Sequence, residues 1–191
     1  NLIVHQVAPA VAVGYPVIVK PAPPTPLTCQ TFLNILFEAG LPKEWATMVA
    51  PENLDLATAL VADKRVGFFS FIGSSGVGWM LRSKLAPGAR CALEHGGVAP
   101  VIVAPDANLD TALPTLAKGG FYHAGQVCVS VQRIFCDAKI AQDVAAGIAA
   151  QADSMKVSDP TLADTDVGPL INHNECDRVA TWVSDATSGG A

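Results

Sequence analysis

Residues 66–85 read VGFFSFIGSSGVGWMLRSKL, and this stretch decides the fold class. Its first part, residues 66–72, has apolar side chains with no polar alternation beyond Ser70, which is typical of a strand buried on both faces of a parallel sheet. Residues 77–85 predict a helix, and a glycine-rich turn joins it to the strand. Strand and helix patterns keep alternating along the chain, so we expect an α/β fold whose parallel sheets have flanking helices.

The same patterns place the other elements and one boundary. Further strands are expected over residues 16–19, 45–49, 90–93, 98–103 and 131–136, and further helices over residues 29–38, 53–62, 109–121, 138–155 and 176–187. Asn53 is expected to cap one of these helices, and either Asp106 or Asn108 another. The pair Gly96-Gly97 separates two series of elements, which predicts one domain over residues 1–95 and another over residues 96–191.

Composition excludes several classes of protein. Hydrophobic residues make up 50% and charged residues 15% of the 191, and the mean hydropathy is +0.36, so the chain can bury a substantial core. The net charge of −5 and the scattered distribution of the 12 Lys and Arg residues argue against a nucleic-acid partner. No apolar run reaches the roughly 18 residues that a membrane helix needs, so no membrane partner is expected.

The cysteines indicate a reducing compartment. Their number, five, is odd, and none stands in a Cys-x-x-Cys pair or beside a plausible set of His ligands. This pattern argues against a disulfide framework and against a zinc site, and it predicts a cytoplasmic protein without a metal. The chain begins at Asn1 with neither an initiator Met nor a signal segment, so we expect it to be part of a longer protein.

The turn Gly73-Ser74-Ser75-Gly76-Val77-Gly78 is a candidate phosphate-binding loop. Glycines let a backbone approach a pyrophosphate closely, and the N–H groups at a helix N-terminus bind anions. The spacing here is G-x-x-G-x-G, whereas the usual dinucleotide fingerprint is G-x-G-x-x-G. A tight strand-to-helix turn that needs positive φ angles would explain the glycines about equally well.

One cysteine differs from the other four in its surroundings. Cys128 follows Gly125-Gln126-Val127, just beyond a predicted helix, and the glycine leaves the thiol accessible enough to react. Free cysteines are usually buried and inert, and this interpretation suits the other four, Cys29, Cys91, Cys136 and Cys176. A carboxylate, Glu94, ends a predicted strand just before the glycine pair, where a lone Glu is usually only solvated.

Together with Lys20-Pro21 after an early strand, these motifs resemble the aldehyde dehydrogenase superfamily in order and spacing, over almost all 191 residues. The resemblance implies a Rossmann-like cofactor domain that runs into an α/β catalytic domain. It implies that Cys128 is the nucleophile and that Glu94 is a general base that activates water, with burial raising the pKa of that carboxyl. It also implies contacts to the cofactor from Lys20, at the adenosine ribose, and from Gly73, Ser74 and Gly78.

The resemblance leaves the cofactor open between NAD and NADP. Many members of the superfamily carry an acidic residue three places after the lysine, where it accepts hydrogen bonds from the ribose hydroxyls, and here that position is Pro23. Two histidines depart from the family pattern as well. His95 and His123 stand where Leu and Asn are frequent, and we expect a structural role for both, with tuning of the thiol or contact with the substrate as the alternative for His123.

The function implied is the NAD(P)-dependent oxidation of a small-molecule aldehyde to a carboxylic acid, through a thiohemiacetal and a thioacyl group on Cys128. The resemblance also implies a homo-oligomer, either a dimer or a tetramer. Two alternatives stay open. A CoA-acylating dehydrogenase generally lacks the base that Glu94 would supply, and a truncated dinucleotide-binding or scaffold fragment would keep the fold without the chemistry.

Overall fold

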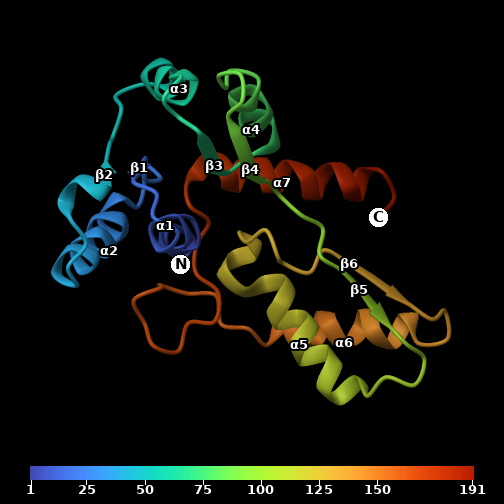
Figure 1. Cartoon of the computed structure of the whole chain (residues 1–191). Helices are drawn as coiled ribbons and strands as arrows, with labels where there is room; N and C mark the ends of the chain where they lie inside the picture. The colour runs from blue at the N-terminus through green and yellow to red at the C-terminus, as the bar shows by residue number, and fades with distance from the viewer. The chain divides into compact units, whose positions relative to one another are not determined.

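The computed structural model describes all 191 residues (Figure 1), which form two compact units, Asn1–His95 and Gly96–Ala191. The boundary lies at the pair Gly96-Gly97. Strands pair in parallel in both units and helices accompany them, so the predicted α/β class is confirmed. The assignment of one unit to cofactor binding and of the other to catalysis stays a prediction.

The first unit contains two pairs of parallel strands. β1 (Val17–Val19) pairs with β2 (Ala46–Met48), and β3 (Phe68–Ile72) pairs with β4 (Arg90–Glu94). The helices of this unit are α1 (Leu2–Ala12), α2 (Pro26–Glu38), α3 (Leu54–Ala62) and α4 (Ser75–Arg82), with a 3₁₀ turn at Lys43–Trp45. As predicted, Asn53 caps α3, where its side chain accepts a hydrogen bond from the Leu56 N–H at 3.0 Å.

No element is predicted over residues 2–12, where the structure has α1, a helix with Pro9 inside it. Tertiary packing explains why a helix forms despite Pro9. Val7 is 2% exposed, and Ile3 and Val11 lie one turn before and after it against the same core. That core is shared with β1, β2 and α2, and its buried members are Val7, Val19, Cys29, Leu33 and Ala46.

Strand β3 differs from the prediction of a strand buried on both faces. β4 is its one strand partner, in a register that runs from Phe68 opposite Arg90 to Ile72 opposite Glu94. Phe69 and Phe71 are half-buried and their rings stack, whereas Phe68 is 60% exposed. The apolar run of β3 is therefore buried on one face only in this structure.

The second unit contains one pair of parallel strands, β5 (Pro100–Val103) and β6 (Arg133–Cys136). Its helices are α5 (Leu109–Phe121), α6 (Ala141–Asp153) and α7 (His173–Ser188). α5 and α6 lie side by side next to the strand pair (Figure 1), and the core between them is built around Val103, Leu116 and Val144. Asn108 caps α5 by accepting a hydrogen bond from the Thr111 N–H at 3.3 Å, so of the two predicted caps Asn108 is the one used.

None of these helices has the length and apolar character required to cross a membrane.

Candidate functional site

The parallel pairing of β3 and β4 brings two predicted site residues together. Parallel strands end at the same edge of a sheet, and here Glu94, the last residue of β4, lies opposite Ile72. The Gly73 N–H donates a hydrogen bond to the Glu94 carbonyl oxygen at 3.0 Å. The backbone of the proposed general base is therefore fixed to the first residue of the glycine turn.

Helix α4 begins at Ser75, two residues after Gly73. Ser74 is its N-cap residue, but the Ser74 side chain makes no capping hydrogen bond. Residues 73–76 are exposed, and the first turn contains no acidic side chain. The first N–H groups of a helix lack partners within the helix and carry partial positive charge, so this end of α4 can hold an anion such as a phosphate group.

Two glycines of this turn allow close packing, and none of its three glycines has an unusual backbone angle. Gly73, Gly76 and Gly78 all have ordinary φ angles, so a turn that needs positive φ, the alternative explanation, is wrong. A Cβ on Gly73 would lie 2.6 Å from the ring of Phe71, and a Cβ on Gly78 would overlap Nε2 of His95. Gly73 and Gly78 therefore make room for side chains, whereas a Cβ on Gly76 would meet nothing within 4 Å.

His95 is held at this corner by aromatic packing. Its ring meets Trp79 edge-on at a centroid distance of 5.4 Å and Phe71 at 6.4 Å. Nε2 is buried against Gly78 and has no hydrogen-bond partner within the chain. These contacts join the end of β4 to α4, which agrees with the structural role expected for His95.

Two further predicted residues of the first unit are exposed. Lys20 directly follows β1, and its Nζ donates a hydrogen bond to the Pro21 carbonyl oxygen at 2.9 Å. Glu94 is exposed as well, so the expected burial of this carboxylate is wrong for this structure. Glu94 is the last residue of β4, and the residue opposite it is Ile72 of β3.

Cys128 lies in the second unit, after a turn with unusual backbone angles. The helix α5 ends at Phe121 and a 3₁₀ turn covers Tyr122–Gly125. Within it His123 (φ 51°), Ala124 (φ 55°) and Gly125 (φ 72°) adopt the left-handed region in succession. For residues with a side chain this conformation costs roughly 1–2 kcal/mol each, and such strain tends to gather at functional sites.

Contacts on several sides fix the backbone around Cys128. The Gly97 backbone lies so close to the Cys128 carbonyl oxygen that a Cβ on Gly97 would be 2.6 Å from it. Two residues after Cys128, Ser130 is 2% exposed and its N–H donates to the Val127 carbonyl oxygen at 3.0 Å. Before Cys128, the side-chain Nε2 of Gln126 donates to the His123 carbonyl oxygen at 3.0 Å. Cys128 itself is exposed.

The other cysteines follow the prediction in part. Cys29 is buried, which raises the pKa of its thiol, and Cys91 and Cys136 are half-buried. Cys176 is exposed on α7, so the prediction of inert burial is wrong for this residue. Helix α7 has no buried residue, which explains why a cysteine on it remains accessible.

Sequence reasoning missed the contributions of Gln126, Gly97 and Ala124. In the sequence Gly97 indicates only a domain boundary, and nothing beyond the glycine itself indicates its close approach to Cys128. The residue type of Ala124 does not indicate left-handed backbone, and His123 indicates it only in that histidine is enriched in this region. No three His, Cys, Asp or Glu side chains converge in a way that could hold a metal ion.

Comparisons with known proteins extend over the whole chain. The family model described as "Aldehyde dehydrogenase family" matches residues 1–191. A 3-sulfolactaldehyde dehydrogenase from Priestia aryabhattai is 35% identical over 191 residues, which are 100% of this chain and 40% of the relative. An aspartate-semialdehyde dehydrogenase from Pseudomonas canavaninivorans is 37% identical over the same shares of the two chains, 100% and 40%. The chain thus spans about 40% of the length of these curated relatives.

Solved structures also match the whole of this chain with less than half of their own length. An aldehyde dehydrogenase from Mycobacterium tuberculosis in complex with NAD+ superimposes with a TM-score of 0.93 at 30% identity, over 100% of this chain and 39% of that one. A glyceraldehyde-3-phosphate dehydrogenase from Methanocaldococcus jannaschii in complex with NADP gives a TM-score of 0.90 at 35% identity, over 100% of this chain and 42% of that one.

Proposed function

The chain belongs to the aldehyde dehydrogenase family, and we propose that the protein of which it is part oxidises an aldehyde to a carboxylic acid with NAD or NADP. The observation that carries the proposal is the exposed Cys128 thiol on a left-handed turn, in a chain that matches the family over its full length. The proposal includes a reducing, cytoplasmic location and a homo-oligomeric assembly, both drawn from the sequence pattern and the family resemblance.

The residues at the start of α4 suit a dinucleotide. Gly73 and Ser74 are exposed at a helix N-terminus without acidic side chains, where a pyrophosphate would find free N–H groups. Lys20 is exposed at the end of β1, where its ammonium group can donate to ribose hydroxyls. The solved relatives include one in complex with NAD+ and one with NADP, so either cofactor fits the family.

In the first half of the proposed reaction, the Cys128 thiolate forms a bond to the aldehyde carbon, and the carbonyl electron pair moves to the oxygen. The backbone N–H of Cys128 donates a hydrogen bond to this oxyanion. When bound, the cofactor accepts the hydride that the carbon gives up. What remains on Cys128 is a thioester.

In the second half, Glu94 releases the acid. Its carboxylate takes a proton from a water molecule, whose oxygen attacks the thioester carbon. The carbon–sulfur bond then breaks, the carboxylic acid leaves, and Cys128 returns to the thiolate. The base therefore acts after hydride transfer, so loss of the base and loss of the thiol should have different kinetic effects.

The aldehyde itself stays open. The relatives named above act on aldehydes of different kinds, one bearing a sulfonate and one bearing an amino acid group, as their names state. We therefore propose to assay a panel of aldehydes with both cofactors before any substitution is tested, and to use the best pair of substrates for the experiments below.

Replacing Cys128 with Ala in the full-length protein tests the proposal. Aldehyde oxidation should be abolished, while the dissociation constant of the cofactor should change little, because the thiol is not among its proposed contacts. Cys176→Ala is a matched control, since Cys176 is also exposed and has no proposed role. A Cys128→Ala enzyme that keeps a tenth or more of the wild-type rate would rule Cys128 out as the nucleophile.

A further inference from the structure

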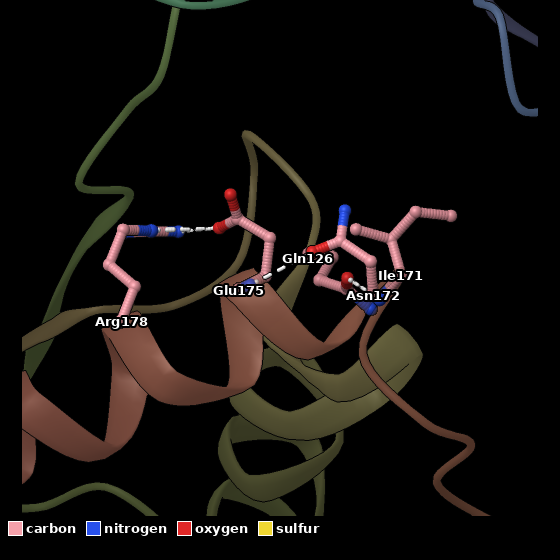
Figure 2. Close-up of polar contacts among 5 residues, drawn as sticks. All are labelled: Gln126, Ile171, Asn172, Glu175 and Arg178. Carbon is pink, nitrogen blue, oxygen red and sulfur yellow. Dashed lines mark hydrogen bonds and ion pairs between the residues drawn. The ribbon is translucent and has the colours of Figure 1, made fainter.

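Gln126 uses every polar group of its side chain within the second unit. Its Nε2 donates hydrogen bonds to the carbonyl oxygens of His123, at 3.0 Å, and of Pro169, at 3.4 Å. Its Oε1 accepts a hydrogen bond from the Ile171 N–H at 2.9 Å, and Figure 2 shows the two residues facing each other. A primary amide offers two N–H donors and one carbonyl acceptor, so all of these groups are used.

These bonds join parts of the chain that are far apart in the sequence. Pro169 lies 43 and Ile171 45 positions after Gln126. Ile171 is followed directly by Asn172, the N-cap of α7, whose side chain accepts from the Glu175 N–H at 2.9 Å. Glu175 pairs in turn with Arg178 one turn further along (Figure 2). The Gln126 side chain thus bonds the segment that leads directly into the N-cap of α7.

The side-chain amide of Gln126 also bonds the left-handed turn that precedes it. The His123 carbonyl oxygen accepts two hydrogen bonds from Gln126, one from Nε2 and one from the backbone N–H at 3.1 Å. His123 is the first of the three left-handed residues, and Cys128 follows Gln126 by two positions. The carbonyl of Cys128 in turn lies against Gly97. The backbone that carries the thiol is therefore restrained from both sides.

We propose that Gln126 is a positioning residue for Cys128: its side-chain amide ties the left-handed turn to the start of α7 and so fixes the direction from which the thiol meets the aldehyde. This role rests on the proposed function, in which Cys128 is the nucleophile. It concerns the step in which the carbon–sulfur bond forms, and it does not concern the cofactor, whose proposed contacts lie in the first unit.

Replacing Gln126 with Met in the full-length protein tests the proposal. Met has nearly the same length but neither donates nor accepts these hydrogen bonds. Gln132→Met is the matched control, because Gln132 is exposed, lies four positions after Cys128, and makes no side-chain hydrogen bond. The measurements are the single-turnover rate of cofactor reduction at saturating aldehyde and the dissociation constant of the cofactor.

We expect Gln126→Met to slow the single turnover by about ten- to 100-fold, the usual consequence of a misplaced reacting group. Cofactor affinity should stay within about twofold of the wild type, and Gln132→Met should match the wild type in both measurements. An equal effect of the two substitutions on the single turnover would overturn the proposal, as would a Gln126→Met loss that is matched by an equal loss of cofactor affinity.

A second pair of variants leaves Gln126 unchanged and decides the matter if Gln126→Met does not fold. Ile171→Pro removes the N–H that donates to Oε1, whereas Ile171→Ala keeps it and removes only an exposed side chain. The proposal expects a slower single turnover for Ile171→Pro than for Ile171→Ala, and equal rates would contradict it. Failure of the proposed function shows itself separately, because Cys128→Ala would then remain active whatever the Gln126 variants do.

Discussion

The turn between β3 and α4 and the loop that carries Cys128 both depend on glycines, but for different reasons. In the first, Gly73 and Gly78 have ordinary backbone angles and make room for the side chains of Phe71 and His95. In the second, Gly125 shares a left-handed turn with two residues that carry side chains, and Gly97 makes room for a backbone carbonyl. Side chains can be exchanged, whereas a backbone carbonyl cannot.

This difference separates the two regions experimentally. A substitution that fills space in the β3–α4 turn should be compensated by a second substitution, because the opposing group is a side chain. A similar substitution at Gly97 should not be compensated by any second substitution, because the opposing group is the backbone carbonyl of Cys128. Glu94, whose carbonyl oxygen accepts a hydrogen bond from the first residue of the β3–α4 turn, acts after hydride transfer in the proposed reaction, whereas Cys128 acts before it.

Replacing Glu94 with Gln should have the largest effect. Gln has nearly the same shape but cannot take a proton from water, so release of the acid should slow by about 10²–10⁴-fold. The first turnover should survive and give a burst of about one reduced cofactor per active site, measured by rapid mixing. If the carboxylate also helps to form the thiolate, the burst itself will slow, and raising the pH toward the usual Cys pKa of about 8.5 should restore it.

A normal steady-state rate in Glu94→Gln would remove Glu94 from the mechanism. It would also favour CoA over water as the acyl acceptor, which dependence of the turnover on added CoA would then show.

Replacing Gly97 with Ala should have the next largest effect. The new Cβ would lie 2.6 Å from the Cys128 carbonyl oxygen, so the loop must shift. We expect a loss of stability of up to about 3 kcal/mol, as for other overpacked sites, together with a slower single turnover. Gly96→Ala is the control, because a Cβ there would meet nothing within 4 Å. Equal effects of the two substitutions on the single turnover would contradict the close approach.

Replacing Pro23 with Glu should change cofactor preference and leave the Cys128 loop untouched. A carboxylate at this position would accept hydrogen bonds from the adenosine ribose and repel a 2′-phosphate, which favours NAD over NADP. The ratio of kcat/KM for NAD to kcat/KM for NADP should rise by a factor equivalent to about 1–3 kcal/mol. An unchanged ratio would mean that the ribose is held elsewhere.

Replacing Gly78 with Ala should have the smallest effect of these substitutions, and it should act on the free energy of unfolding. The added methyl group would overlap Nε2 of His95, and we expect a loss of about 1–2 kcal/mol in the free energy of unfolding. His95→Ala should recover most of this loss in the double variant, because the new Cβ would overlap Nε2 of His95 but would lie 3.1 Å from the ring of Phe71, the next side chain. Gly76→Ala, which meets nothing within 4 Å, is the control. Strictly additive effects of Gly78→Ala and His95→Ala would contradict the packing described here.

Regular structure could largely be predicted from the sequence, since apolar periodicity and caps determine it locally. The cap of α3 by Asn53 and the strands β3 and β4 show this. Helix α1 could not be predicted, because Pro9 argues against a helix and only the burial of Val7 in the core outweighs it.

The candidate site could be predicted in its residue types but not in its geometry. The motifs identify Cys128 and Glu94 by resemblance, and no pattern reports that the loop before Cys128 is left-handed or that Gln126 reaches Ile171. Such contacts join segments more than 40 positions apart and depend on how the chain folds back. The expected burial of Glu94 failed for the same reason, since burial depends on what packs over a strand end.

The central claim is that Cys128 carries the acyl group, and the Glu94→Gln enzyme allows this to be measured directly. The enzyme is mixed once with aldehyde and oxidised cofactor, quenched in acid and digested, and the peptides are weighed by mass spectrometry. The peptide with Cys128 should gain the mass of one acyl group in place of the thiol hydrogen, and hydroxylamine should remove this group. Reduction of the cofactor with an unmodified Cys128 peptide, or with the acyl group on Cys176, would contradict the account.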